Sequence, residues 1–294
     1  MLENGIVLVT GATGLLGGHL VAELARRGVT TVACGGPGRG ALGIDLAVCD
    51  DTVASFVSAA RPRVVIHAAA VTLISDCARD PERAEAVNVA GTVRVADACR
   101  DAGARLVHVS TDLVFDGEHA PYDEKAAPAP LSVYGRSKLA AEHEAARRVP
   151  NLLVVRTTLL FGPTLTTRRG FFDQQLEALK TGSPRMRLFE DEWRTPLSLR
   201  AAAEALVAMA REDDLRGTIH LGGPERVSRY EMGERLARHV GVDPASVFER
   251  ASRLGIGGEP RPRDVSLDSS AFHRVFPHLA VDDFESECTR MGVR

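Results

Sequence analysis

Short apolar runs alternate with amphipathic segments through the first two-thirds of the chain. The apolar runs are Ile6 to Val9, Thr30 to Cys34, Arg63 to Ala70, Arg105 to Ser110 and Asn151 to Arg156. Helical patterns lie between them, as in residues 17–28 and 81–103, and Gly103 is a natural helix stop. Apolar strands separated by helices are typical of a parallel sheet covered on both faces. The pattern predicts a doubly wound α/β fold whose ligands bind beyond the carboxyl ends of the strands.

The pattern changes after Phe161. The later segments are loop-rich at 162–170 and 181–196, helical at 198–210 and 228–241, strand-like at 217–223, and rich in Gly, Pro and Arg at 257–270. We expect a dinucleotide-binding domain over residues 1–162, to which about residues 197–220 return. Residues 163–196 and 221–294 would form a smaller substrate-binding lobe.

Composition narrows the class of protein. The 294 residues are 45% hydrophobic and 26% charged, as in ordinary soluble globular proteins, and the net charge of -3 gives no reason to expect nucleic acid or an anionic membrane as partner. No apolar run is long enough for a bilayer, and no signal peptide is indicated, so a cytoplasmic protein is expected. The five cysteines are scattered without a CxxC pair, and the nine histidines lack a ligand pattern. Reduced thiols and no metal site are expected.

Glycines are regularly spaced directly after the first apolar run. Such glycines allow a tight turn and close approach to a pyrophosphate, while the following helix offers free N–H groups and a positive dipole end. The position between strand and helix is the context that supports nucleotide binding over a merely glycine-rich turn. The cofactor-binding residues predicted in this loop are Gly11, Thr13, Gly14, Leu15, Leu16 and Gly17.

The end of the second strand bears on the choice of dinucleotide. NAD sites usually carry an acid there for the ribose 2′-hydroxyl, but this chain continues Cys34-Gly35-Gly36. Arg39 in the same loop could meet a 2′-phosphate, or could simply point into solvent. NADP(H) is therefore favoured, with NAD as the alternative.

Tyr134 and Lys138 lie four residues apart in a chain that has only three tyrosines and three lysines. They could be ordinary neighbours on one helix face. They could also form a proton-donating couple, because a cation near a phenol favours the phenolate and so eases proton exchange. The spacing alone leaves both readings open.

Together with the glycine loop, residues 67–70, 109–117 and 133–138 make the set specific. The chain resembles the extended short-chain dehydrogenase/reductases, which have a Rossmann-like fold. Within that superfamily, residues 110–142 most resemble the dTDP-4-dehydrorhamnose reductase family. Residues 156–162, 191–196 and 261–268 also match elements of that family. The resemblance covers nearly the whole chain and is strongest up to about residue 162.

The resemblance implies roles for the matching residues. Tyr134 would protonate a ketone oxygen, and Lys138 would favour the phenolate and hold the nicotinamide ribose. Thr111 would hydrogen-bond the substrate carbonyl, with Ser110 as the runner-up. The other residues expected at the cofactor are Asp45, Leu46, Ala68, Ala69, Ala70, Asn88 and Ser110.

The substrate side matches the family less well. Leu159 stands where the family usually has an aromatic residue, and Val71 where it commonly has tyrosine, so a stacking surface is lost. Arginine forks suit phosphate oxygens, and Trp193 offers a replacement surface. The residues expected at the substrate are Thr72, Asp112, Trp193, Arg194 and Arg261.

The sequence thus predicts a cytoplasmic, NADPH-preferring ketoreductase. Its substrate would carry a keto group on a nucleotide-activated deoxysugar, most plausibly the 4-keto group of a dTDP-sugar. A nucleotide-sugar epimerase or dehydratase and a reductase of a non-sugar ketone remain alternatives. A third alternative is a non-catalytic NADP-binding subunit, similar to the regulatory β subunit of methionine adenosyltransferase. A homodimer is one candidate assembly.

Overall fold

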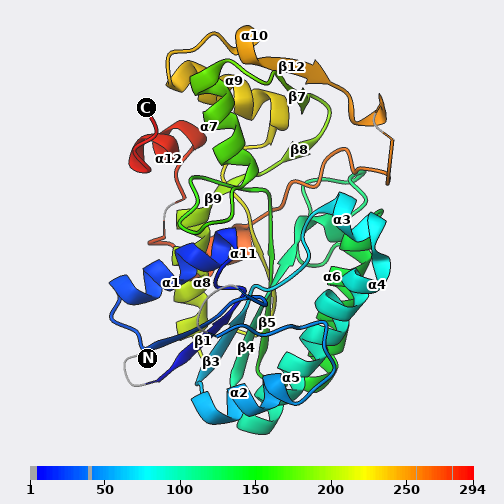
Figure 1. Ribbon diagram of the computed structural model, residues 1–294, viewed down its shortest axis with the longest axis vertical. Coiled ribbons are helices and arrows are strands. Elements are labelled where there is room, and N and C mark those ends of the chain that lie inside the picture. Colours follow the sequence, from blue (N-terminus) through cyan, green and yellow to red (C-terminus); the bar gives the residue numbers. More distant parts are fainter. Residues whose placement is uncertain (1–4, 39–41, 256, 280) are drawn as a thin grey trace.

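A six-stranded parallel sheet lies at the centre of the computed structural model, which describes residues 5–38, 42–255, 257–279 and 281–294. Its strands are β1 (Val7–Thr10), β2 (Thr31–Cys34), β3 (Val64–His67), β4 (Arg105–Thr111), β5 (Leu152–Thr157) and β10 (Gly217–Leu221). Their order is β2-β1-β3-β4-β5-β10 (Figure 1). The predicted doubly wound fold is confirmed. The strand order reverses beside β1, and such a switch point is where open α/β sheets bind ligands.

Helices cover both faces of this sheet, which explains why its strands are almost uniformly apolar. One face carries α1 (Leu15–Arg26), α8 (Leu199–Arg211) and α11 (Ser270–Val275). The other carries α2 (Thr52–Ala60), α5 (Gly91–Ala102) and α6 (Val133–Arg148) (Figure 1). Alternate residues of each strand feed the two cores, so that Val9 and Ile66 pack on one side and Leu8 and Val65 on the other.

The helix expected over residues 81–103 is divided into three parts. It comprises α4 (Pro81–Ala84), a π-helical turn η1 (Glu85–Ala90) and α5. The Thr92 hydroxyl donates to the Asn88 carbonyl at 2.6 Å inside this region. Gly103 ends α5 with a φ of 66°, so the predicted stop is confirmed. A π-helical turn inside a helix often lies at a functional site.

A smaller lobe lies beyond the carboxyl ends of the strands, in the upper part of Figure 1. Its helices are α7 (Phe171–Thr181), α9 (Arg229–His239), α10 (Pro244–Val247) and α12 (Phe284–Arg290). Its strands are β7 (Met186–Phe189), β8 (Trp193–Arg194), β11 (Val227–Ser228) and β12 (Phe248–Ala251). β7 pairs with β12 and β8 with β11, so the expectation of loop for residues 181–196 was wrong in part. Strands of two to four residues are too short to show an alternating pattern, and their pairing partners are distant in sequence. No local pattern therefore reveals them.

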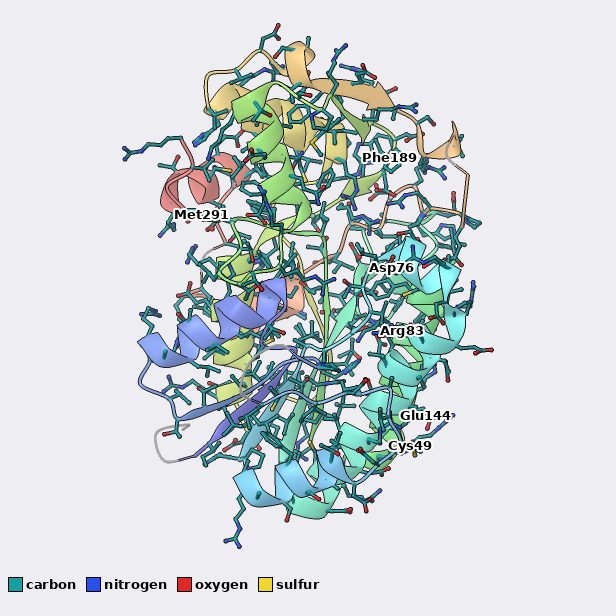
Figure 2. All side chains as sticks on the ribbon, viewed as in Figure 1. Cys49, Asp76, Arg83, Glu144, Phe189 and Met291 are labelled. Carbon is teal, nitrogen blue, oxygen red and sulfur yellow. The ribbon has the colours of Figure 1, made fainter. Side chains whose placement is uncertain are left out.

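The chain crosses between the two parts several times. β6 (Leu160–Phe161) pairs with β9 (Leu197–Ser198), after which α8 and β10 return to the sheet. The sulfur of Met291, which is labelled in Figure 2, lies close against Gly162: a Cβ on this glycine would stand only 2.8 Å from it. Residues Tyr122 and Leu267 form an isolated bridge. The residue limits given above for the two units stay a prediction.

Two further short helices follow β3 and β4: α3 (Ile74–Arg79) after residues 68–73, and a 3₁₀ turn (Asp112–Val114) directly after β4. They therefore stand at the carboxyl edge of the sheet. Among the described residues, no helix is both long and apolar enough to cross a membrane. Within the same residues, no cluster of His, Cys, Asp or Glu could hold a metal ion.

Candidate active site

The glycine loop between β1 and α1 is packed too closely for any side chain. Gly11 has a φ of 73°, and a Cβ there would lie 2.7 Å from the Ala69 nitrogen. A Cβ at Gly17 would lie 2.0 Å from the Gly11 carbonyl oxygen. The loop thus touches both itself and the segment after β3. The N–H groups of Ala12 and Gly14 donate to the Cys34 and Gly11 carbonyls at 2.9 Å and 2.8 Å, which holds the turn in shape. The N-terminus of α1, which follows this turn at the carboxyl edge of the sheet, is where an anion can be met.

The remaining loop residues play different parts. Leu16 belongs to the apolar core, whereas Thr13 and Leu15 are partly exposed. A Cβ at Gly170 would lie 2.9 Å from Leu15, so the start of α7 in the upper lobe reaches the loop. Thr13 and Leu15 are therefore placed to contact a bound molecule, while Leu16 positions α1.

Residues 35–38, which directly follow β2, carry no acid. Cys34 is buried, which raises its pKa to about 12, and a Cβ at Gly36 would meet no atom within 4 Å. Arg39 lies outside the described residues. Asp45 is exposed and its carboxylate accepts from the Ala47 N–H at 2.9 Å, whereas Leu46 is a core residue. The space at Gly36 is open to a ribose substituent.

Tyr134 and Thr111 come together because α6 starts directly against the end of β4. Ser132 caps α6 by accepting from the Gly135 N–H at 3.1 Å. A Cβ at Gly135 would lie only 2.2 Å from the Leu113 carbonyl oxygen. This close approach brings the Tyr134 side chain within hydrogen-bonding reach of the Thr111 side chain.

Lys138 follows one helical turn later, and all three predicted catalytic side chains are buried. Burial raises the pKa of Tyr134 well above its usual value, against the lowering effect of the Thr111 hydrogen bond. Burial lowers the pKa of Lys138 to about 8, although the charge of Glu142 raises it. At neutral pH the site therefore holds a protonated phenol beside an ammonium group, which is the state that a proton donor needs.

Ser110 is directed away from this group. Its hydroxyl donates to the Glu142 carboxylate, which in turn forms a buried ion pair with Arg156 at 2.7 Å. The hydroxyl of Ser110 is thus committed to the helix behind the site. The Thr111 hydroxyl donates to the Asp112 carboxylate at 3.1 Å and accepts from the Leu113 N–H at 3.2 Å, but it lies within reach of Tyr134. Of the two hydroxyls, it is therefore the better placed to meet a carbonyl beside Tyr134.

Asn88 also serves the site from behind. Its amide oxygen accepts from the Val71 N–H at 2.8 Å, and its amide nitrogen donates to the Val71 carbonyl at 3.0 Å and to Ser137 at 2.9 Å. These contacts clamp the segment after β3 to α6. The clamp leaves Ala68, Ala69 and Ala70 half-buried and Thr72 exposed, all at the carboxyl edge.

Two histidines lie side by side under Lys138. His67 and His108 pair in register on β3 and β4, with ring centroids 5.3 Å apart. His67 is bonded at both nitrogens, to the Thr10 hydroxyl at 2.6 Å and the Thr92 hydroxyl at 3.0 Å. Burial, together with the charge of Lys138, lowers the pKa of His67 to about 3. His67 is therefore neutral in the folded protein.

The arginines expected at the substrate sit in a buried charge cluster. Arg194 lies 2.9 Å from Asp112 and 3.9 Å from Glu192. Arg229 and Arg261 bind the same Glu192 at 2.7 Å and 2.6 Å. Burial would raise the pKa of Glu192, but the charges of Arg194, Arg229 and Arg261 lower it to about 2. Three guanidinium groups thus face two carboxylates, which leaves one positive charge near the mouth of the site.

Arg194 is the most enclosed of these arginines, and its ion pair with Asp112 reaches the residue after Thr111. This pair suits a positioning role better than direct contact with a ligand. Arg229 and Arg261 are partly exposed and better placed for one. Trp193 is half-buried, and Arg226 covers one face of its ring at 4.6 Å from the centroid.

A water-sized cavity of about 20 Å³ lies in the upper lobe, beyond β5. Leu159, at the position where an aromatic residue was expected, lines it together with Phe171, Phe172 and Arg229. The amide nitrogen of Gln175 is buried there and has no hydrogen-bond partner among the described residues. The aromatic surface missing at Leu159 is therefore supplied nearby by two phenylalanines.

Sequence reasoning missed His108, Glu142, Arg156, Glu192 and Arg229. Glu142 could have been found, because it stands four residues after Lys138 on one helix face. The others lie on separate strands and loops, and only the fold brings them to the site. No sequence signal distinguishes Arg229 from the other arginines of the chain.

The fold and the group at its carboxyl edge define an extended short-chain dehydrogenase/reductase. The family described as RmlD substrate binding domain matches residues 5–291, and the chain belongs to this family.

Several proteins of known name are similar along most of their length. The chain is 34% identical over 276 residues to a dTDP-4-dehydrorhamnose reductase of Mycobacterium tuberculosis, covering 91% of this chain and 85% of the relative. It is 33% identical to a dTDP-4-keto-6-deoxy-D-glucose reductase of Streptomyces niveus, with 91% and 90% covered. It is 29% identical to methionine adenosyltransferase 2 subunit beta of Danio rerio, with 90% and 83% covered.

Solved structures share the fold over the full length. The dTDP-4-dehydrorhamnose reductase of Clostridium acetobutylicum superposes with a TM-score of 0.86 at 25% identity, covering 97% of this chain and 98% of that chain. The reductase of Bacillus anthracis, solved in complex with NADP, gives 0.85 at 24% identity, with 98% and 99% covered.

The neutral, buried state of His67 makes stability depend on pH. Its folded pKa of about 3 is below its ordinary value of 6.5, so the unfolded chain binds more protons between these values and stability is lost as pH falls. We expect His67 alone to remove about 1.4 kcal/mol of unfolding free energy between pH 7.5 and pH 5.5. Urea titrations at several pH values measure this slope. His67→Gln should flatten it, whereas His143→Gln on the exposed side of α6 should not; equal slopes in all three proteins would contradict the assignment.

Proposed function

We propose that this protein is an NADPH-dependent reductase of a keto group on a nucleotide-activated deoxysugar, with a dTDP-4-keto-6-deoxyhexose as substrate. The observation that carries the proposal is the buried group of Thr111, Tyr134 and Lys138 at the carboxyl edge of the sheet. The reductases of M. tuberculosis and S. niveus support the class of substrate.

The residues present fit a dinucleotide. A Cβ at Gly11 or Gly17 would clash with the chain's own backbone, so glycine is needed for the tight turn that directs the start of α1 toward a pyrophosphate. The alanines after β3 and Lys138 would line the nicotinamide half. When bound, the cofactor supplies the hydride.

The chain's own residues would handle the carbonyl oxygen. Thr111 and Tyr134 would hold this oxygen by hydrogen bonds, and Tyr134 would pass its phenolic proton to it as negative charge develops there. The Lys138 ammonium would stabilise the resulting phenolate. The two arginines with exposed edges, Arg229 and Arg261, would face the substrate diphosphate.

Replacing Tyr134 tests this proton donation. Tyr134→Phe should lower kcat by about 10²-fold or more, while the Kd for NADPH stays within about threefold. The assay follows NADPH loss with a dTDP-4-keto-6-deoxyhexose, and NADPH binding by fluorescence. Tyr230→Phe is the matched control, since both rings are 8% exposed. Full turnover by Tyr134→Phe would refute the proposed role.

NADP(H) is assigned as the cofactor because residues 35–38, after β2, carry no acid and leave open space at Gly36. NAD would be the weaker ligand. Gly36→Asp would restore an acid where a 2′-phosphate would lie, with room for the new side chain. We expect it to weaken NADPH binding about tenfold relative to NADH by charge repulsion. Gly36→Asn has the same shape without the charge and should keep the preference. Titration of both cofactors measures the ratio; an unchanged ratio in Gly36→Asp would place the phosphate elsewhere.

The same assay distinguishes two alternative functions. An epimerase or dehydratase would be purified with tightly held cofactor and would turn over without added NADPH. A non-catalytic subunit, the reading favoured by the D. rerio relative, would bind NADPH and turn over no ketone. The complete Thr111, Tyr134 and Lys138 set favours the reductase.

A cytoplasmic location also belongs to the proposal. Four of the five cysteines are buried free thiols, and Cys49 is an exposed one, which suits a reducing compartment. The net charge of -3 gives no electrostatic reason to expect nucleic acid as a partner.

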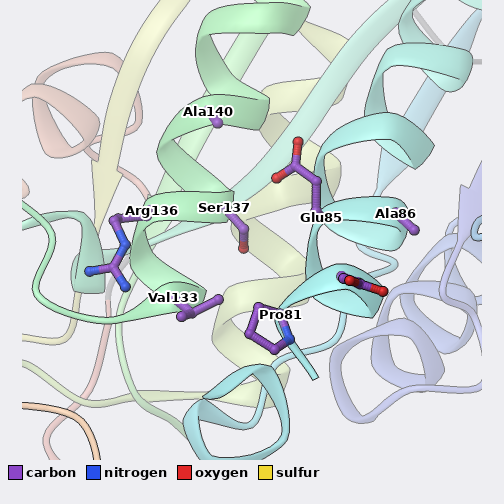
Figure 3. Close-up of a pocket in the computed structure, with 8 residues that line it drawn as sticks. Pro81, Glu85, Ala86, Val133, Arg136, Ser137 and Ala140 are labelled. Atoms are coloured by element: carbon purple, nitrogen blue, oxygen red, sulfur yellow. The ribbon is translucent and has the colours of Figure 1, made fainter. Parts of the chain in front are cut away.

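We further propose that two copies pair through the outer face of α6. A groove of about 720 Å³ runs there between α4, η1 and α6 (Figure 3). Glu82, Glu85 and the small Ala86 line one wall, and Arg136 and the small Ala140 line the other. A two-fold related copy would bring each Arg136 to the partner's acidic wall.

The oligomeric state tests this pairing. Light scattering should give a dimer for the wild type and a monomer for Ala140→Glu, which adds bulk and negative charge to the groove. Ser58→Glu, on the exposed side of α2, is the control and should remain dimeric. A monomeric wild type, or a dimeric Ala140→Glu, would exclude this interface.

A further inference from the structure

Lys138 has one direct partner beneath it, a histidine that has no place in the proposed reaction. Its ammonium nitrogen lies 3.2 Å from Nε2 of His108 on β4. Lys138 is 2% exposed and His108 is fully buried. The other imidazole nitrogen, Nδ1 of His108, has no hydrogen-bond partner among the described residues. A buried polar atom without a partner is unusual and calls for an explanation.

The contacts of the two neighbouring histidines fix where their protons lie. The Thr92 hydroxyl donates its only hydrogen to the Asn88 carbonyl, so it accepts from Nε2 of His67, and His67 is protonated at Nε2. An ammonium group can only donate, so Nε2 of His108 must accept from Lys138. His108 therefore carries its proton on Nδ1, the nitrogen that faces no acceptor.

We propose that His108 is a positioning residue that holds the Lys138 ammonium group through Nε2. This inference rests on the role given to Lys138 in the proposed reduction. The unpartnered Nδ1–H follows from it, because turning the imidazole proton to Nε2 would remove the acceptor that the buried cation needs. A neutral acceptor holds the ammonium in place without the attraction of a full negative charge, so the other N–H groups remain directed at the site.

Other charged and titratable groups also face this part of the site. On α6 itself this is Glu142, on β3 His67, and on β5 Arg156 through its ion pair with Glu142. Burial lowers the pKa of His108 well below its usual value, with the charges of Lys138 and His67 acting in the same direction. His108 thus stays neutral over the pH range in which Lys138 titrates.

The proton positions can be measured in the wild-type protein without any substitution. Nitrogen-15 chemical shifts of the histidine rings distinguish the two tautomers. Among the four buried histidines of the described residues, we expect His67 to be protonated at Nε2 and His108 at Nδ1 at about pH 6.5. If His108 is protonated at Nε2, Lys138 does not donate to it and the proposal fails.

Substitution then separates this contact from burial alone. The chain has only three lysines, and Lys125 and Lys180 are exposed, so carbon-13 labelled lysine gives one buried signal and two reference signals. His108→Leu should lower the pKa of Lys138 by about one unit, because it removes an acceptor from the charged form. His108→Gln places an amide oxygen near the lost nitrogen and should restore most of that loss.

His67→Gln is the matched control, because His67 is equally buried on the next strand but does not contact Lys138. It should leave the pKa of Lys138 unchanged. An unchanged pKa in His108→Leu, or an equal fall in His67→Gln, would overturn the proposal. These titrations use neither cofactor nor ketone, so their failure would leave the proposed reductase standing. An inactive enzyme that shows the expected shifts would instead refute the reductase alone.

Discussion

The site depends on the contact between the first turn of α6 and the end of β4. Gly135 is the residue that permits it, because any Cβ would stand 2.2 Å from the Leu113 carbonyl. Without this approach, the Tyr134 phenol could not reach Thr111. Lys138, one turn further along α6, is 2% exposed and so is shielded from water. A cation away from water needs polar partners and a fixed position. The neutral histidines and the Glu142–Arg156 pair surround Lys138 with polar groups, and the Asn88 clamp fixes α6, which carries it.

A second constraint ties the two parts of the molecule together at the same point. Asp112 follows Thr111 directly, and its carboxylate binds both Thr158 at 3.1 Å and Arg194 of β8 at 2.9 Å. A buried ion pair contributes little net stability compared with apolar packing, but losing one partner leaves an unpaired buried charge. The pair therefore fixes the position of the upper lobe, which docks where Arg194 meets Asp112. It also fixes the Glu192 cluster relative to Thr111.

Much of this arrangement could be predicted from the sequence, and the reason is local chemistry. The strands, the glycine loop and the Tyr134–Lys138 spacing depend on residues close together in the chain, where periodicity and turn chemistry act. The π-helical turn at Asn88 could not be predicted, because it depends on contacts with Val71 and Ser137 from other elements. Glu192 and Arg229 were missed for the same reason, since no local pattern marks a residue that a distant strand will enclose.

The departures on the substrate side separate the inherited chemistry from the choice of sugar. The proposed proton donation depends on the backbone approach at Gly135 and on Thr111, Tyr134 and Lys138. Val71 contributes apolar packing beside Tyr134, which a smaller residue than tyrosine still provides. Under the proposed function, the sugar would be recognised by surfaces of the upper lobe, where Phe171 and Phe172 stand beside the smaller Leu159. An aromatic ring on α7 instead of at Leu159 changes where a substrate can stack. The reacting carbonyl of the substrate would still be positioned by Thr111 and Tyr134. The same catalytic edge can therefore serve different sugars, and the identity of the sugar has to be sought in the upper lobe.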